Sequence, residues 1–175
     1  LKYTIDNFGV DAFRTELEKR CGFQLEEAKP YTFTDRKDHY GWKQNHEGKW
    51  YYSVFIENGR VLDDENIALK TALLEVAKTG KANFRFTGNQ NLILADIEET
   101  DKAVVEKLLT KFGVIAHTDH AGALRRNAMA CVAFNTCPLA LAEAQRYLPF
   151  LIDKIEPLLA KHSLQNEEII LRMTG

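Results

Sequence analysis

The stretch Asn127–Pro138, N-A-M-A-C-V-A-F-N-T-C-P, decides how the C-terminal part of this chain folds. Within it, Met129–Phe134 is a short apolar run of the kind that forms a buried strand. The next two residues, Asn135 and Thr136, favour a turn. Pro138 suits the first position of a helix, because its missing N–H would have no partner there. The pattern therefore predicts a strand, a turn and the start of a helix in close succession.

Two of the three cysteines, Cys131 and Cys137, lie in this stretch with five residues between them. The prediction places Cys131 on the strand and Cys137 at or next to the helix N-terminus. The free N–H groups and the positive dipole end there favour a thiolate, the form of cysteine that binds metal. The alternative is two buried, unreactive cysteines, since free cysteine is often buried and this spacing is not one of the strong paired-cysteine signatures.

The bulk composition excludes several classes of protein. The net charge is −2, so the chain lacks the basic footprint of a nucleic-acid binder. No apolar run approaches the roughly 18 residues that cross a membrane, and no signal peptide is visible. Three cysteines, an odd number, argue against a disulfide framework and indicate a reducing cytoplasm.

Residues 1–38 are predicted to form an arm, a helix and a linker. Leu1–Val10 is expected to be extended. Asp11–Arg20 has helical spacing and should end near Gly22, which places Cys21 on the apolar face as a core residue. Gln24–Asp38 is polar and irregular, as expected for a linker or a loop lying across the domain.

Residues 39–115 alternate strands with helices. The predicted elements are strands at His39–Gln44, Lys49–Glu57 and Arg60–Leu62, a helix from Leu69 to Ala77 capped by Asn66 and closed by Gly80, strands at Ala82–Thr87 and Leu92–Ile97, and a helix from Val104 to Phe112 ended by Gly113. This order predicts an α+β fold, with a mixed or antiparallel sheet and helices on one face.

Three weaker candidate sites precede the cysteines. Arg85 and Thr87 share one face of a strand and could hold an anion such as a carboxylate, although a structural role is favoured. The aromatic residues of the first strands could stack bases, but core and cross-strand packing is the favoured interpretation. These aromatic residues are Trp42, Trp50, Tyr51, Tyr52 and Phe55.

The segment Val114–Arg126 contains His117, Asp119 and His120, which could bind a metal. Because no further ligand can be placed near them, a mobile polar loop is the favoured interpretation.

After Pro138 the chain is predicted to contain helices over Leu139–Tyr147 and from Leu148 onward, with a kink at Pro157. Glu168–Met173 is predicted to be a strand. A strand, a helical crossover and a second strand make a parallel unit if both strands share a sheet.

The residues N-A-M-A-C-V-A-F-N-T-C-P-L-A at 127–140, followed by A-E-A-Q-R-Y-L-P-F at 142–150, resemble the nitrite/sulfite reductase family. The opening L-K-Y-T-I-D-N and the C-V-A-F-N-T-C core are most similar to the hemoproteins of NADPH-dependent sulfite reductases. The family pattern continues with a second cysteine pair directly after a Thr-Gly dipeptide, whereas this chain ends in R-M-T-G at Arg172–Gly175. We therefore expect a fragment of a larger enzyme.

The resemblance implies a ferredoxin-like half domain at 39–115 and the start of an α/β iron–sulfur and siroheme-binding domain at 128–175. It implies that Cys131 and Cys137 are two ligands of a [4Fe–4S] cluster coupled to siroheme, in a cytoplasmic enzyme that reduces sulfite to sulfide by six electrons. The implied partners are sulfite and a flavoprotein subunit that supplies electrons from NADPH for sulfate assimilation and cysteine biosynthesis. We expect this fragment to be inactive, with no catalytic residue of its own and no bound cofactor.

Two alternatives remain. The chain could derive from a ferredoxin-dependent sulfite or nitrite reductase, which shares the architecture and the cysteine spacing. It could instead be a non-catalytic α+β module that binds a ligand or a protein.

Overall fold

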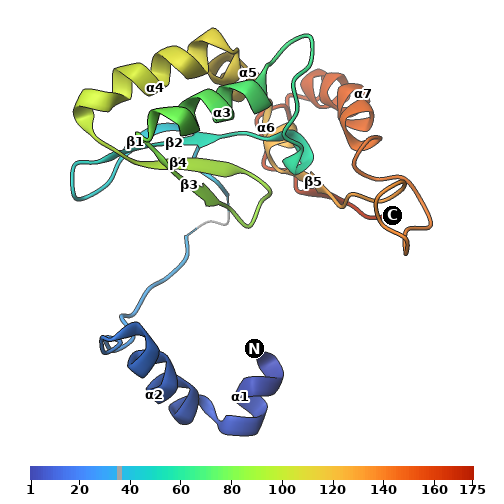
Figure 1. Ribbon diagram of the computed structural model, residues 1–175. Helices are drawn as coiled ribbons and strands as arrows, with labels where there is room; N and C mark the ends of the chain where they lie inside the picture. The colour runs from blue at the N-terminus through green and yellow to red at the C-terminus, as the bar shows by residue number, and fades with distance from the viewer. Residues whose placement is uncertain (35–36) are drawn as a thin grey trace. The chain divides into compact units, whose positions relative to one another are not determined.

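A computed structural model describes residues 1–34 and 37–175. The chain divides into two compact units, Leu1–Arg36 and Lys37–Gly175 (Figure 1). Within the described ranges, no helix has both the length and the apolar character needed to cross a lipid bilayer.

The first unit consists of two helices, α1 (Lys2–Phe8) and α2 (Val10–Cys21). The extended arm predicted for Leu1–Val10 is therefore wrong, and Gly9, with a φ of 81°, separates the two helices. The helix α2 ends at Gly22 in the left-handed conformation, as predicted. Cys21 is exposed rather than in a core, because no residue of α2 is buried.

The linker predicted from Gln24 to Asp38 contains no helix or strand in its described residues. Its residues Asp35 and Arg36 lie outside the described ranges.

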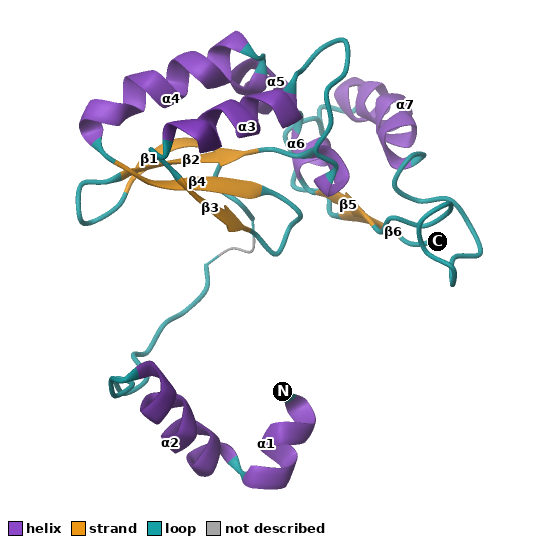
Figure 2. Cartoon of the chain, in the orientation of Figure 1, coloured by secondary structure: helices purple, strands orange, loops and turns teal. Residues whose placement is uncertain are grey.

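The second unit is built on a four-stranded antiparallel sheet with the order β1-β2-β4-β3 (Figure 2). The strands are β1 (Gly41–Gln44), β2 (Trp50–Val54), β3 (Asn83–Phe86) and β4 (Leu92–Ile97). Two helices, α3 (Leu69–Thr79) and α4 (Glu99–Lys111), cover one face of this sheet. The predicted α+β architecture, with helices on one face of the sheet, is confirmed.

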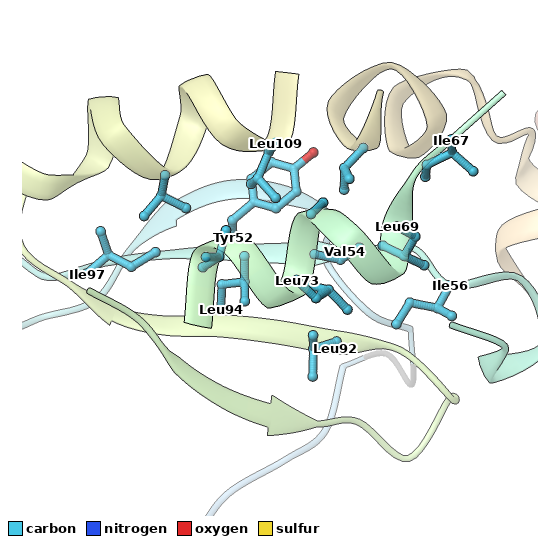
Figure 3. Close-up of a cluster of buried hydrophobic side chains, with 14 residues drawn as sticks. Tyr52, Val54, Ile56, Ile67, Leu69, Leu73, Leu92, Leu94, Ile97 and Leu109 are labelled. Carbon is cyan, nitrogen blue, oxygen red and sulfur yellow. The ribbon is translucent and has the colours of Figure 1, made fainter. Parts of the chain in front are cut away.

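The first core lies between the sheet and these helices (Figure 3). Alternate residues of a strand point to the same face, so Tyr52 and Val54 meet Leu92 and Leu94 on the helix side. The helices contribute apolar residues at helical spacing, which are Leu69, Ala72, Leu73, Val76, Val105 and Leu109. The apolar side of the alternating strands thus faces the apolar side of the two helices, and this face of the sheet is covered.

The third strand predicted at Arg60–Leu62 is wrong. Asn58 and Gly59 do adopt positive φ, at 53° and 69°, but they lie in a short 3-10 turn, η1 (Glu57–Gly59). The chain cannot return beside β2 because β1 and β4 already occupy both edges of that strand. It forms only an isolated bridge between Asp63 and Ala68.

The helix α3 is not capped by Asn66, as the sequence predicts. Its N-cap is Ala68, which makes no side-chain cap hydrogen bond. Instead, Asp63 accepts a hydrogen bond from the backbone N–H of Thr71 at 3.0 Å, in the first turn of the helix. This hydrogen bond, with a second from the Thr71 hydroxyl, lowers the pKa of Asp63 below its ordinary value. Asp63, six residues before the helix begins, therefore accepts one of the N–H groups that a side-chain cap would otherwise satisfy.

The mobile loop predicted at Val114–Arg126 is wrong as well. This segment forms two short helices, α5 (Val114–His120) and α6 (Ala123–Arg126). Val114 and Thr118 are fully buried one helical turn apart, so the segment packs into the core despite its polar composition.

The C-terminal part contains β5 (Ala128–Ala130), α7 (Leu148–Lys161) and β6 (Leu171–Met173). The strands pair in parallel, as predicted, although both are shorter than the sequence indicates. The helix predicted at Leu139–Tyr147 is wrong, because these residues form only turns and irregular backbone ahead of α7. A second core forms around β5, β6 and α7. Its buried residues are Leu124, Ala130, Ala133, Ala144, Leu148 and Ile152.

Candidate metal centre

Cys131 is the first residue beyond β5, at the edge where the two parallel strands end. Its N–H donates to the carbonyl of Met173 at 3.1 Å, which continues the pairing with β6 by one step. The N–H of Gly175 donates to the Cys131 sulfur at 3.3 Å. The residues that follow β6 therefore meet the thiol that follows β5.

Cys137 ends a tight loop, residues 131–137, which we call the cysteine loop. Its N–H donates to the carbonyl of Ala133 at 2.9 Å, which closes a single turn. The next helix, α7, begins only at Leu148, so the predicted place of Cys137 at a helix N-terminus is wrong. Cys137 is half-buried, whereas Cys131 is exposed, and both are free thiols.

Small residues allow the chain segments to approach closely around the cysteine loop. A Cβ at Gly175 would collide with the carbonyl oxygen of Ala142 and lie 2.6 Å from the Cβ of Ala133. Ala133 is itself fully buried. The end of the chain, the cysteine loop and the segment before α7 are thus packed at backbone distance.

The thiols have exposed apolar neighbours in the sequence. Val132 and Phe134 follow Cys131 in the cysteine loop and are 51% and 43% exposed, and Leu139 and Leu141 follow Cys137 at 85% and 92%. Exposed apolar residues gathered in one segment are typical of a surface that another group covers.

The chain on either side of the cysteine loop is attached to the four-stranded sheet and to η1 by hydrogen bonds of side-chain amides. Gln90, in the turn between β3 and β4, donates to the carbonyl of Ala130 at 2.8 Å. The backbone carbonyl of Gln145 accepts from Asn58 at 3.2 Å, and its side-chain oxygen accepts from Arg60 at 2.7 Å. The position of the cysteines therefore depends on the sheet and on η1.

A charged cluster around a largely buried arginine joins η1 to α7. The guanidinium of Arg125, with 17% of its side chain exposed, pairs with Glu57 on η1 and with Asp153 and Glu156 on α7. Burial works against the charge of Arg125, but the three carboxylates outweigh it and raise the pKa of the guanidinium. One arginine thus ties three elements together.

Arg85 and Thr87, the candidate anion site, both engage carboxylates of the protein. Arg85 pairs with Asp96 at 2.6 Å, and the Thr87 hydroxyl donates to Asp38 at 2.7 Å. These contacts agree with the structural role that the sequence favours. They also place Asp38, the last residue of the predicted linker, against the turn that follows β3.

Asp38 belongs to a hydrogen-bonded network with Asn91 and Tyr40. The Asn91 amide donates to Asp38 at 2.8 Å and to the Tyr40 hydroxyl at 3.0 Å, and its oxygen accepts from the N–H of Ile56 at 2.8 Å. Burial, followed by the charge of Asp38, raises the pKa of Tyr40 from 10.0 to about 12.

This shift predicts a loss of stability in alkali. Between pH 10 and about 12 the unfolded chain releases the Tyr40 proton and the folded chain keeps it. The stability that Tyr40 contributes is therefore complete below pH 10 and is lost as the pH rises to about 12. The Tyr40→Phe variant lacks this ionisation. In urea unfolding, we expect the stability of the wild type relative to Tyr40→Phe to fall by on the order of 1 kcal/mol across this window. Parallel stability curves for the two proteins would contradict the prediction.

The candidate metal group at His117, Asp119 and His120 is not assembled. His117 stacks on Phe55, with ring centroids 5.5 Å apart, and burial lowers its pKa. Across the described ranges, no group of three or more His, Cys, Asp or Glu residues is placed to hold a metal ion. The role of Cys131 and Cys137 as metal ligands therefore stays a prediction.

Comparison with known proteins places this chain beside one family. Residues 43–112 match the nitrite/sulfite reductase ferredoxin-like half domain. All 175 residues align at 59% identity with the sulfite reductase [NADPH] hemoprotein beta-component of Leptospira biflexa, and 174 residues align at 48% with that of Escherichia coli. The chain is a homologue of the sulfite reductase hemoprotein beta-component.

The chain spans about a third of the length of the curated relatives it matches, with 32% of the Leptospira protein and 30% of the Escherichia coli protein covered. The solved structure of the Mycobacterium tuberculosis NirA protein superposes with a TM-score of 0.63 at 26% identity, over 99% of this chain and 31% of that one. The family resemblance and the half-domain fold predicted from the sequence are both confirmed.

Proposed function

We propose that this chain is part of a sulfite reductase hemoprotein and that Cys131 and Cys137 are two thiolate ligands of its [4Fe–4S] cluster. The observation that carries the proposal is the meeting of Cys131 with the residues that follow β6. Because the strands are parallel, thiols placed after each of them lie at one edge, facing a common space. A cluster of this kind takes four cysteine ligands, so the two thiols supply half of the set.

The residues present fit such a group. Both cysteines are free, one sulfur already accepts a backbone N–H, and the neighbouring side chains are apolar. Hydrogen bonds to the sulfurs and an apolar surround are the features by which proteins tune iron–sulfur clusters. When bound, siroheme and the cluster would relay to sulfite the six electrons that its reduction to sulfide requires.

The described residues have a supporting part in this reaction. Cys131 and Cys137 would hold the metal, the Gly175 N–H would orient one thiolate, and the exposed apolar neighbours would cover the bound group from water. We propose that the chain by itself is inactive and that the longer protein receives electrons from NADPH through a flavoprotein subunit in the cytoplasm.

Anaerobic iron and sulfide reconstitution tests this proposal. We would compare this chain and the longer protein that contains it, each with Cys131→Ser, Cys137→Ser and, as a matched control, Cys21→Ser. In the longer protein we expect about four irons and visible cluster absorption in the wild type and Cys21→Ser, and less than about one iron in the other two variants.

Each outcome separates the possibilities. A longer protein that keeps four irons without Cys131 or Cys137 would reject the ligand assignment. If neither chain length binds iron, the result would support the alternative, a non-catalytic binding module.

If the cluster forms, a test of electron donors separates the two classes of reductase. The two donors compared are NADPH with a flavoprotein and reduced ferredoxin. The identity of 48–59% to NADPH-type hemoproteins favours the first class.

A further inference from the structure

The cysteine loop holds two residues in left-handed backbone. Ala133 and Asn135 have φ values of 49° and 68°. Alanine seldom adopts this region, whereas asparagine tolerates it better. Such backbone persists only where its surroundings hold it. A contact that fixes Asn135 would therefore help to set the shape of the loop between the two thiols.

The guanidinium of Arg146 makes such a contact with the side-chain amide of Asn135. Because a guanidinium carries only donors, the amide oxygen is the atom that faces it. That oxygen accepts hydrogen bonds from Nη1 at 2.7 Å and from Nη2 at 3.1 Å. A contact at two points fixes direction as well as distance.

Arg146 is itself held in place by Glu143. Its Nε donates to Glu143 Oε2 at 2.9 Å, and its Nη2 contacts the same oxygen. The other carboxylate oxygen accepts from the N–H of Ala144 at 3.0 Å, and Ala144 is fully buried in the second core. The hydrogen bond from Arg146 lowers the pKa of Glu143, which keeps this carboxylate charged. The arginine is thus fixed to the scaffold at one side and to the cysteine loop at the other.

We propose that Arg146 is a positioning residue that clamps the cysteine loop through Asn135 and so fixes Cys137 relative to Cys131. Its positive charge, held beside the loop, would also offset the negative charge of two metal-binding thiolates. That the clamp helps the two thiols bind metal rests on the proposed function. That it holds the shape of the cysteine loop does not.

The accessibility of Cys137 reports on the clamp directly. We would alkylate the folded chain with iodoacetamide and measure the rate at Cys137 relative to Cys21 by peptide mass spectrometry. Cys21 is exposed in the other unit and serves as an internal reference. We expect the ratio to rise at least about threefold in Arg146→Gln and in Asn135→Ala, because a contact that closes the loop is lost.

The double variant separates a clamp from a general loosening. If Arg146 acts through Asn135, combining the two changes raises the ratio no further than either change alone. Asn135→Asp should keep the wild-type ratio, because a carboxylate also accepts both N–H groups. Arg85→Gln, which removes an exposed arginine from a carboxylate at another site, should leave the ratio unchanged.

An unchanged ratio in Arg146→Gln, or effects that add in the double variant, would overturn the clamp. Cadmium titration, followed by thiolate-to-metal absorption, then addresses ligation. We expect Arg146→Gln to weaken cadmium binding about tenfold if the clamp serves the metal site. If the wild-type chain binds no cadmium while the alkylation ratio still responds, the proposed metal role fails and the clamp stands.

Discussion

Replacing Leu94 by alanine should lower the free energy of unfolding by about 3 to 5 kcal/mol, because the cavity left in a packed core adds to the lost transfer energy. Leu94 is fully buried on β4, opposite Tyr52 on one neighbouring strand and Phe84 on the other. It lies under the helices in the middle of the first core (Figure 3). Urea unfolding followed by circular dichroism measures the loss.

Leu74 offers a matched control for this experiment. It lies on α3, the helix that covers the same core, but it is 53% exposed. The same leucine-to-alanine change there should cost less than about 1 kcal/mol, since little packed surface is lost. Equal losses at the two positions would mean that the sheet and α3 do not share the core described above.

Replacing Arg125 by methionine should cost about 2 to 3 kcal/mol, because removing one partner of a largely buried ion pair leaves the other charges without compensation. This loss is smaller than the roughly 3 to 5 kcal/mol of a fully buried pair, because Asp153 is 66% exposed and remains hydrated. Glu57 and Glu156 are more enclosed, at 29% and 34% exposure, and account for most of the effect. Thermal and urea unfolding would both detect it.

A second change on the same cluster distinguishes this cause from lost packing. Adding Glu57→Gln to Arg125→Met should recover part of the stability, because one uncompensated charge is removed. Arg85→Met, which breaks a pair whose arginine is 62% exposed, should cost less than about 1 kcal/mol. If Glu57→Gln makes Arg125→Met less stable still, the charges are not the reason for the loss.

The sequence predicted the parts of the fold that depend on local pattern. The four strands and the helices α3, α4 and α7 follow from alternation, from helical spacing and from glycines such as Gly80 that end a helix. The parallel pairing of β5 and β6 followed from the order strand, helix, strand. Cys131 was predicted on a strand over Met129–Phe134, but β5 ends at Ala130 and Cys131 is the first residue beyond it.

The errors occurred where tertiary contacts outweigh local preference. Val114–Arg126 looked polar, but Val114 and Thr118 bury one side of α5 against the core. Leu139–Tyr147 had a helical composition, yet Arg146 and Glu143 hold each other in a turn. The prediction of a buried Cys21 failed for a different reason, since α1 and α2 bury no residue and no core is there to hold it.

The sequence by itself determined the family resemblance and the α+β class, and it identified Cys131 and Cys137 as candidate ligands. These conclusions depend on residue identity and short-range spacing. Only the tertiary structure decided what surrounds the cysteines. Gly175 meets Cys131, Gln90 meets Ala130 and Arg146 meets Asn135 through the packing of separate segments. Contacts between residues far apart in the chain depend on how buried surfaces fit together, and no local pattern encodes that fit.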